Sequence, residues 1–276
     1  MTALTVGDTG VERHDVPRGL IWVWRDSWTE AMRHLQAVPR SPELLMFATL
    51  QPIMFVLLFV YVFGGSIQIP GMPDDMYVQY LIPGIFAQTM VFNSAFTGVG
   101  VAEDLSKGII DRLRSLPMYQ PAVLIGRTVS DTARNLLTFA VMFTVGLLVG
   151  FRVTGGIAGG VAATLLLLGF SYAFSWIQAF IGLSVGSVEA ANSAGFIWMF
   201  PLTFVSSAFV STENMPPWLE TIANANPFTK LTNACRALYN GIDPGSDLPI
   251  AIAWAIGITV VFCVLATTKF SRSASR

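Results

Sequence analysis

Charged side chains are absent from six long intervals of this sequence. The intervals cover residues 44–73, 76–102, 135–151, 153–188, 190–212 and 248–268. A helix needs about 20 predominantly apolar residues, within a range of about 17 to 25, to cross the hydrocarbon core of a bilayer. Each interval can therefore hold one crossing. Only 12% of the 276 residues are charged, about half the share typical of a soluble domain, so the pattern excludes a soluble chain.

The apolar intervals are continuous, which indicates helices that cross the membrane. Strands of a membrane β-barrel instead alternate apolar and polar residues over about ten positions. We therefore predict an all-α, polytopic integral membrane protein. Its six transmembrane helices are expected at about residues 44–64, 77–100, 122–150, 158–185, 193–211 and 248–268. One membrane domain, residues 18–268, is flanked by a flexible tail at 1–17 and a basic tail at 269–276.

Positively charged residues are concentrated on one side of the predicted spans. Loops on the cytoplasmic side of membrane proteins carry an excess of Lys and Arg. With a cytoplasmic N-terminus, the inner side collects Arg13, Arg18, Arg25, Arg33, Arg40, Lys107, Arg112, Arg114, Lys269, Arg272 and Arg276. The outer side then carries only Arg152, Lys230 and Arg236. We expect a multi-pass protein of the cell (plasma) membrane with both termini in the cytoplasm.

Two further segments have the pattern of amphipathic helices. In residues 18–38, apolar residues recur every three to four positions opposite a charged face, as in a helix that lies in the membrane interface. Packing of this helix on a soluble partner is the alternative. Residues 212–247 contain two short amphipathic segments, which begin near Met215 and at Pro227. Both are too short to span, so we expect an outer re-entrant or interfacial helical hairpin.

The residues that common catalytic and metal sites require are missing. The sequence has no G-x-x-x-x-G-K-[ST] loop to hold nucleotide phosphates. His14 and His34 both precede the first span, which argues against a metal cluster. Cys235 is expected in a loop stretch and Cys263 inside the last span, which argues against a disulfide between them. A formal net charge of −1 offers no basic surplus for nucleic acid. We expect no catalytic residue, no metal ion and no cofactor bound by this chain.

Three charged residues lie near the inner end of the third predicted span. Arg127, Asp131 and Arg134 are spaced by four and three positions, which places them on one face of a helix, where Asp131 can pair with either arginine. An interfacial salt-bridge ladder and a role in coupling both fit this pattern. Because the spans otherwise lack deeply placed ionisable residues, a proton- or ion-coupled transporter is disfavoured.

The densest polar segment is the inner loop at residues 103–117. As a helix, it would align Leu105, Ile109, Leu113 and Leu116 in one apolar stripe and leave its charged side chains on the other face. Such a stripe fits a groove of a soluble partner. A helix on the membrane surface has the same pattern, so the residues alone leave both possibilities open.

Four strings of residues resemble those of a known family. The string AEDLSKGIIDRLRSLPM at 102–118, followed by GRTVSDTARN at 126–135, resembles the cytoplasmic loop and third span of type-2 ABC transporter permeases. The resemblance is strongest to the daunorubicin/doxorubicin-resistance permease group of actinobacteria. LQPIMFVLLFVYVFGG at 50–65 and MPPWLETIANANPFTKLTNACRALYNG at 215–241 are similar to the same group.

This resemblance implies the permease part of an ATP-driven exporter. In such permeases six helices form one half of a dimeric export pathway, and a separate ATP-binding subunit hydrolyses ATP, with Mg²⁺, in the cytoplasm. The complex would contain two permeases, as identical copies or paralogues, and two ATP-binding subunits. Segment 103–117 would be the coupling helix that docks on the ATP-binding subunit, 18–38 the interfacial elbow and 212–247 the outer re-entrant helices. The coupling residues would be Glu103, Asp104, Lys107, Gly108, Asp111, Arg112, Arg114 and Pro117.

The cargo path is expected at the interface between the two permeases. Its apolar and aromatic walls suit an amphiphilic drug, polyketide or lipid. Candidate polar contacts along the path are Gln51, Gln88, Asn93 and Asn192, and hydrogen bonds between helices explain each of them equally well. An ion-coupled secondary transporter, or a membrane scaffold or intramembrane enzyme that moves no cargo, are the alternative functions.

Overall fold

Helices account for all regular structure in the residues that the structure describes. The computed structural model of the chain describes residues 42–62, 77–110 and 121–272. In chain order its elements are α2 (Pro42–Leu57), the π-helix η2 (Leu58–Val62), α3 (Tyr77–Asn93), α4 (Ala95–Ser106), α6 (Pro121–Val149), α7 (Gly156–Gly182), α8 (Val188–Phe204), the 3-10 turn η4 (Thr212–Asn214), α9 (Pro217–Ala225), α10 (Pro227–Asn240) and α11 (Asp247–Arg272). No strand occurs in these three ranges, so the prediction of an all-helical protein is confirmed for them.

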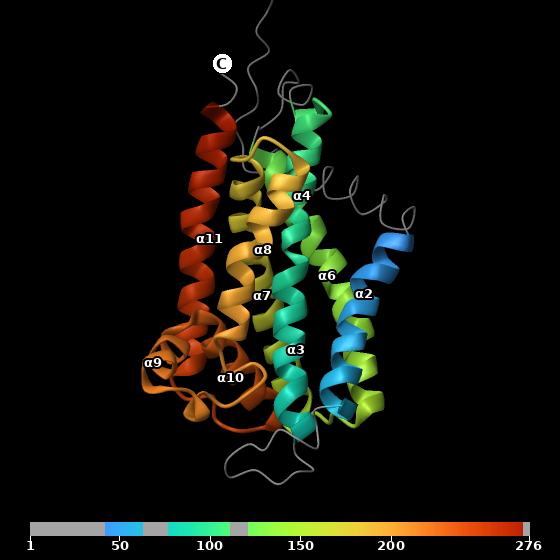
Figure 1. Cartoon of the computed structure of the whole chain (residues 1–276), viewed down its shortest axis with the longest axis vertical. Helices are drawn as coiled ribbons and strands as arrows, with labels where there is room; N and C mark the ends of the chain where they lie inside the picture. The colour runs from blue at the N-terminus through green and yellow to red at the C-terminus, as the bar shows by residue number, and fades with distance from the viewer. Residues whose placement is uncertain (1–41, 63–76, 111–120, 273–276) are drawn as a thin grey trace, which may run out of the picture.

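The long helices run alongside one another and share two ends (Figure 1). The last turn of α11 and the last turn of α4 lie at one end of the bundle, whereas α9 and α10 lie at the other. The start of the charged inner loop is therefore on the same side as the end of α11, and the segment 212–247 is on the opposite side. This arrangement agrees with the relative sidedness that the charge pattern predicts.

Among the described residues, four helices are long and apolar enough to cross a membrane. They cover Tyr77–Ser106, Val123–Val149, Gly156–Gly182 and Asp247–Ser271. The first and fifth predicted spans hold shorter helices: the apolar stretch Leu50–Val62 in α2 and η2, and α8 with 17 residues. A helix thus lies in each of the six predicted intervals, and four of the six have the length and composition of a crossing.

The rod formed by α3 and α4 is the centre of the bundle, and α11 is its most exposed long helix. The most apolar 18-residue stretch of the Tyr77–Ser106 helix is 89% buried. The corresponding stretch of Asp247–Ser271 is only 6% buried. The exposed helix is the more hydrophobic of the two, with a mean hydropathy of 2.5 against 1.3. Lipid tails are as apolar as leucine, so exposure does not disfavour apolar side chains in a membrane. Polar residues in the middle of this rod, Gln88, Thr89, Asn93 and Thr97, by contrast lie inside the protein.

Glycines bring α4 and α7 into close contact. A Cβ atom on Gly182 of α7 would lie 2.3 Å from the carbonyl oxygen of Gly98 in α4, so the two backbones touch at this point. Small residues permit this approach between membrane helices. Val101 of α4 and Trp176 and Ala179 of α7 continue the contact as part of an apolar cluster. The inner half of α4 is consequently packed tightly on α7.

The segment 212–247 folds into two short helices at the end opposite to the inner loop (Figure 1). Asn226 caps α10, because its Oδ1 accepts a hydrogen bond from the Phe228 amide at 2.8 Å. Gly241, in the left-handed conformation at φ 69°, ends the helix. The buried face of α10 includes Phe228 and Leu231, which confirms that this segment is amphipathic.

The environment of Cys235 differs from the prediction. This cysteine was expected in a loop stretch, but it lies fully buried in α10. The Pro227 start and the Asn226 cap make this stretch a regular helix, and its apolar face carries the thiol inward. Cys235 and Cys263 are both free. The predicted interfacial helix at 18–38 lies outside the described residues.

Candidate functional site

The charged segment 103–117 begins as the last turn of α4 rather than as a separate helix. Glu103 and Asp104 belong to α4, which ends at Ser106. Gly108 then adopts φ +66°, a left-handed conformation that stops an α-helix. Helical conformation resumes at Ile109 and Ile110. The predicted single helix with Leu105 and Ile109 in one stripe is therefore wrong at its start, because Gly108 turns the backbone between these two residues.

The first turn of this segment presents charge at the protein surface. The Lys107 Nζ donates a hydrogen bond to Glu103 Oε1 across one helical turn, and both side chains are about half exposed or more. This hydrogen bond raises the pKa of Lys107. Asp111, Arg112, Arg114 and Pro117 lie outside the described residues. The described part of the segment is thus an exposed, charged helix end followed by a glycine turn.

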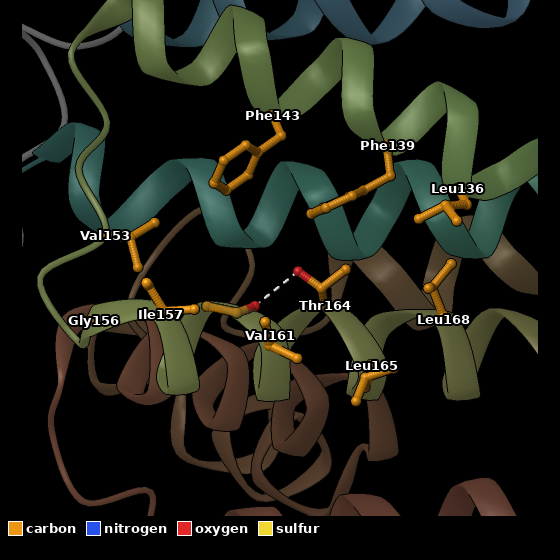
Figure 2. Close-up of a pocket in the computed structure, with 11 residues that line it drawn as sticks. Leu136, Phe139, Phe143, Val153, Gly156, Ile157, Val161, Thr164, Leu165 and Leu168 are labelled. Atoms are coloured by element: carbon orange, nitrogen blue, oxygen red, sulfur yellow. Dashed lines mark hydrogen bonds between the residues drawn. The ribbon is translucent and has the colours of Figure 1, made fainter.

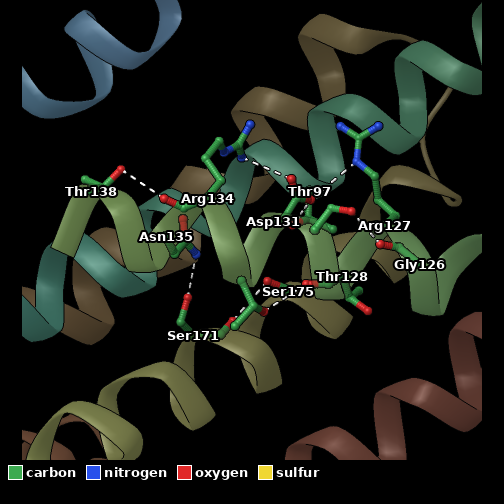
Figure 3. A network of polar contacts seen from close by, with 12 residues as sticks. Thr97, Gly126, Arg127, Thr128, Asp131, Arg134, Asn135, Thr138, Ser171 and Ser175 are labelled. Atoms are coloured by element: carbon green, nitrogen blue, oxygen red, sulfur yellow. Dashed lines mark hydrogen bonds and ion pairs between the residues drawn. The ribbon is translucent and has the colours of Figure 1, made fainter. Parts of the chain in front are cut away.

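Asp131 of α6 is the centre of a buried ion cluster (Figure 3). Only 4% of this residue is exposed. Its Oδ2 accepts a hydrogen bond from the Thr97 hydroxyl of α4 at 2.7 Å and one from Arg127 Nε at 3.3 Å. Its Oδ1 lies 3.2 Å from Nη2 of Arg134. The carboxylate therefore contacts both arginines that share its helix face, and also a hydroxyl of the neighbouring helix.

Arg127 extends from α6 across to α4. Its Nη1 donates to Asp104 Oδ2 at 3.0 Å, so the guanidinium bridges Asp104 and Asp131. Gly100 makes room for this crossing, because a Cβ atom at that position would lie 1.6 Å from Arg127 Nη2. The pairing of Asp104 with the third predicted span was not predicted from the sequence.

The second arginine of the cluster packs on an aromatic ring. The guanidinium carbon of Arg134 lies 5.4 Å from the centroid of the Phe96 ring of α4, within the range of a cation–π contact. Two carboxylates, Asp104 and Asp131, thus face two guanidinium groups, and the formal charges of the four residues balance. Burial of an ion pair is tolerated when its members are paired and hydrogen-bonded. Arg127 and Asp131 meet both conditions, and Arg134 is paired with Asp131.

One turn further along α6, a neutral polar chain joins three helices. Asn135 Nδ2 donates to the Ser171 hydroxyl of α7 at 2.7 Å, and that hydroxyl donates to the Met90 carbonyl of α3 at 2.9 Å. Asn135 and Ser171 are fully buried. The spacing of Arg127, Asp131 and Asn135 by four residues each is a sequence signal that identifies Asn135 as a member of the same face.

The four candidate cargo contacts lie in two different environments. Gln88 and Asn93 are buried in α3, and Gln88 Nε2 has no hydrogen-bond partner among the described residues. Gln51 of α2 and Asn192 of α8 are exposed. No hydrogen bond joins any two of these four side chains in the described part of the chain, so the structure does not assemble them into one site.

An apolar groove of about 620 Å³ lies between α6 and α7 (Figure 2). Phe139 and Phe143 point into it from α6. Among the residues that line the groove, only Thr164 has a polar side chain. Its hydroxyl donates a hydrogen bond to the Gly160 carbonyl at 2.8 Å. The lining is Leu136, Phe139, Phe143, Val153, Gly156, Ile157, Gly160, Val161, Thr164, Leu165 and Leu168. Such a surface accommodates an apolar chain or ring without fixing its orientation.

The described residues also contain no group of three or more His, Cys, Asp or Glu side chains that could hold a metal ion.

Comparisons with known proteins identify the family. The family model of ABC-2 type transporters matches residues 26–239. The daunorubicin resistance ABC transporter permease protein DrrB1 of Streptomyces coeruleorubidus is 33% identical over 264 residues, which are 96% of this chain and 89% of that protein. The probable doxorubicin resistance permease DrrC of Mycobacterium tuberculosis (strain H37Rv) is 22% identical over 83% of this chain and 82% of its own length. The probable multidrug permease YbhR of Escherichia coli (strain K12) is 25% identical over 66% of this chain and 48% of its own length. These matches agree with the helical architecture and with the resemblance to drug-resistance permeases. The chain belongs to the ABC-2 type transporter family.

Proposed function

We propose that this chain is the transmembrane permease subunit of an ATP-driven exporter. The observation that carries the proposal is the 33% identity with a daunorubicin resistance permease over 96% of the chain. Hydrolysis of ATP takes place on a separate ATP-binding subunit, which also holds the Mg²⁺ that phosphoryl transfer requires. The permease itself is not catalytic and binds no cofactor.

The proposed membrane arrangement has six crossings in one domain, residues 18–268. The crossings correspond to α2 with η2, α3 with α4, α6, α7, α8 and α11. Both termini, with the tails 1–17 and 269–276, are cytoplasmic, and the protein resides in the plasma membrane. The common position of the α4 and α11 ends at one end of the bundle supports this orientation. Residues 18–38 form the interfacial elbow, and α9 and α10 form the outer re-entrant hairpin.

The working complex contains two permeases and two ATP-binding subunits. The second permease is another copy of this chain or a paralogue. Segment 103–117 docks on the ATP-binding subunit, with contacts from the exposed Glu103 and Lys107 and from the residues that follow Gly108. The half-exposed charges at the end of α4 support this assignment.

The proposed cargo is an amphiphilic drug, polyketide or lipid. The names of two relatives specify daunorubicin and doxorubicin. Gln51, Gln88, Asn93 and Asn192 are the polar positions proposed along its path. Closure of the two ATP-binding subunits pushes segment 103–117 of each permease, and the resulting tilt of the helices opens the path between the permeases to the outside.

Transport by the reconstituted complex tests this function. Proteoliposomes with the permease and its co-purified ATP-binding subunit are to be loaded with daunorubicin or with a fluorescent phospholipid, and ATP-dependent movement of each is measured. We expect movement of at least one amphiphile that requires both subunits and ATP. Movement driven by a proton gradient without the ATP-binding subunit would instead identify a secondary transporter.

Two kinds of substitution test the docking segment in the same assay. Gly108→Pro is expected to abolish transport, because proline requires a φ near −65° and Gly108 adopts +66°. Reversal of the charges at Asp111 and Arg112 is expected to have the same effect. Retention of full transport by these variants would show that segment 103–117 is not the coupling segment.

A further inference from the structure

The buried ion cluster connects the helix that carries the docking segment to the next transmembrane helix. We propose that Asp104, Arg127, Asp131 and Thr97, here called the α4–α6 joint, pass a displacement of the inner end of α4 to α6. Arg127 is its central positioning residue. The inference rests on the proposed function, because the ATP-binding subunit supplies the displacement.

The joint attaches the two helices at two separate levels. Thr97 and Asp104 are seven residues apart on α4, a distance of about 10 Å along a helix. The upper contact is the hydrogen bond between Thr97 and Asp131, and the lower one is the ion pair between Asp104 and Arg127. Two attachments resist both sliding and rotation, so α6 follows α4 instead of slipping past it.

The remaining neighbours of α4 are of a different kind. This helix packs chiefly against α7 and α8, and its contact with α7 is a close approach of glycine backbones at Gly98 and Gly182. Apolar surfaces of this type carry no directional bond, whereas the contacts with α6 are charged and directional. A force on the end of α4 is therefore transmitted most directly to α6.

Arg127 and Asp131 each have a second charged partner. Arg127 contacts both Asp104 and Asp131, and Asp131 contacts both Arg127 and Arg134. One ion pair can lengthen while the other still neutralises the same buried charge. Low-dielectric surroundings keep such pairs strong at a given distance, so the joint can move without exposing an unpaired charge to the bilayer.

The helix that receives the displacement also forms one wall of the α6–α7 groove. Leu136, Phe139 and Phe143 line that groove, and Leu136 lies only five residues beyond Asp131 on the same helix. A tilt of α6 changes the distance between the groove walls. The joint thus connects the docking segment to an apolar surface deeper in the bundle.

The number of cargo molecules moved per ATP hydrolysed tests the joint. The measurement uses the full permease and ATP-binding subunit complex in proteoliposomes, with Asp104→Asn, Arg127→Gln and the double variant. We expect each to lower the ratio about fivefold or more, the lower end of typical couplings between sites, while ATP hydrolysis continues. The double variant removes one positive and one negative charge together, so its buried charges remain balanced and it is expected to fold where a single variant does not.

A steric substitution separates the effect of the position of Arg127 from the effect of its charge. Gly100→Ala adds a Cβ atom at the place of the Arg127 guanidinium and leaves every charge intact. We expect Gly100→Ala by itself to lower the number of cargo molecules moved per ATP hydrolysed. Added to Arg127→Gln, it is expected to have no further effect on this ratio. The matched control is Lys230→Gln with Asp247→Asn, a half-buried ion pair between α10 and α11, for which the ratio is expected to stay at the wild-type value.

The outcomes separate the joint from the transport function. A wild-type complex without ATP-dependent transport would refute the proposed function, and the joint with it. A wild-type ratio in the folded double variant, alongside normal wild-type transport, would refute the joint alone and assign the cluster to charge compensation. The same conclusion would follow if Gly100→Ala and Arg127→Gln had independent, additive effects.

Discussion

Two arginines tie helices together at opposite ends of the bundle, and their partners differ in kind. At the inner end, Arg127 pairs with the side-chain carboxylates of Asp104 and Asp131. At the outer end, Arg236 of α10 donates at 2.9 Å to each of two backbone carbonyls, those of Tyr80 and Ser207.

The outer arginine is held more rigidly than the inner one. Its guanidinium carbon also lies 3.5 Å from the centroid of the Tyr80 ring, and Nη1 donates to Asn233 Oδ1 at 3.1 Å. Backbone carbonyls move only with their segments, whereas carboxylates on side chains can follow a partner. The outer end is therefore a fixed brace between α10, α3 and the end of α8, and the inner end is an adjustable connection between α4 and α6.

The largest expected effect in this comparison comes from Asp131→Ala. The substitution leaves Arg127 and Arg134 without the carboxylate that they share. Removal of one partner from a buried ion pair costs about 3–5 kcal/mol, so we expect a loss of unfolding free energy of that size. Thermal unfolding in detergent micelles measures it. A loss below about 1 kcal/mol, typical of exposed pairs, would contradict the burial of the inner cluster.

Arg236→Gln is expected to have the next largest effect, and on stability alone. Hydrogen bonds with a charged donor contribute about 1.5–3 kcal/mol, and we expect a loss of about 2–3 kcal/mol in the same unfolding assay. The folded fraction should keep the wild-type ratio of cargo to ATP, because α10 lies at the end of the bundle opposite to the end of α4 and is not part of the α4–α6 joint. A change in that ratio would remove the distinction between brace and joint.

A smaller effect is expected from Ser171→Ala. The Asn135 amide loses its acceptor inside the bundle, and an unsatisfied buried donor costs about 1–3 kcal/mol. We expect about 1–2 kcal/mol from thermal unfolding. Ser171→Thr keeps the hydroxyl and serves as the control. Equal stability of the alanine variant and the wild type would show that the polar chain from α6 to α3 does not stabilise the fold.

The smallest effect is expected at the ion pair of Lys230 and Asp247. Both side chains are just over one-fifth exposed, and partly solvated pairs contribute about 0–1 kcal/mol. Asp247→Asn should therefore lower the unfolding free energy by less than about 1 kcal/mol. A larger loss of unfolding free energy would show that this pair contributes as much as a buried ion pair does.

Charge-free intervals and helix periodicity predicted those parts of the fold that depend on local sequence. The predicted third, fourth and last spans contain α6, α7 and α11, all long enough to cross. Proline at 227 predicted the start of α10. The shared face of Arg127, Asp131 and Arg134 also followed from spacing alone, and the ion pairs join these residues in the structure.

Contacts between distant segments were not predictable from the same patterns. Asp104 and Arg127 are 23 positions apart, and hydropathy does not indicate that α4 lies beside α6. Hydropathy also did not predict which helices are buried, because the more hydrophobic α11 is exposed and the less hydrophobic α3 and α4 are buried. The break after α4 had a signal, the glycine at 108, but the charge pattern of segment 103–117 favoured a continuous helix.

Photocrosslinking at position 107 tests whether segment 103–117 docks on the ATP-binding subunit. A benzophenone amino acid replaces the exposed Lys107 in the assembled complex, and crosslinked products are identified by mass spectrometry. We expect a crosslink to the ATP-binding subunit, with a yield that changes when ATP binds. Absence of that crosslink in a complex that transports cargo, or labelling of a cysteine at position 107 by an impermeant reagent added outside intact cells, would contradict this docking.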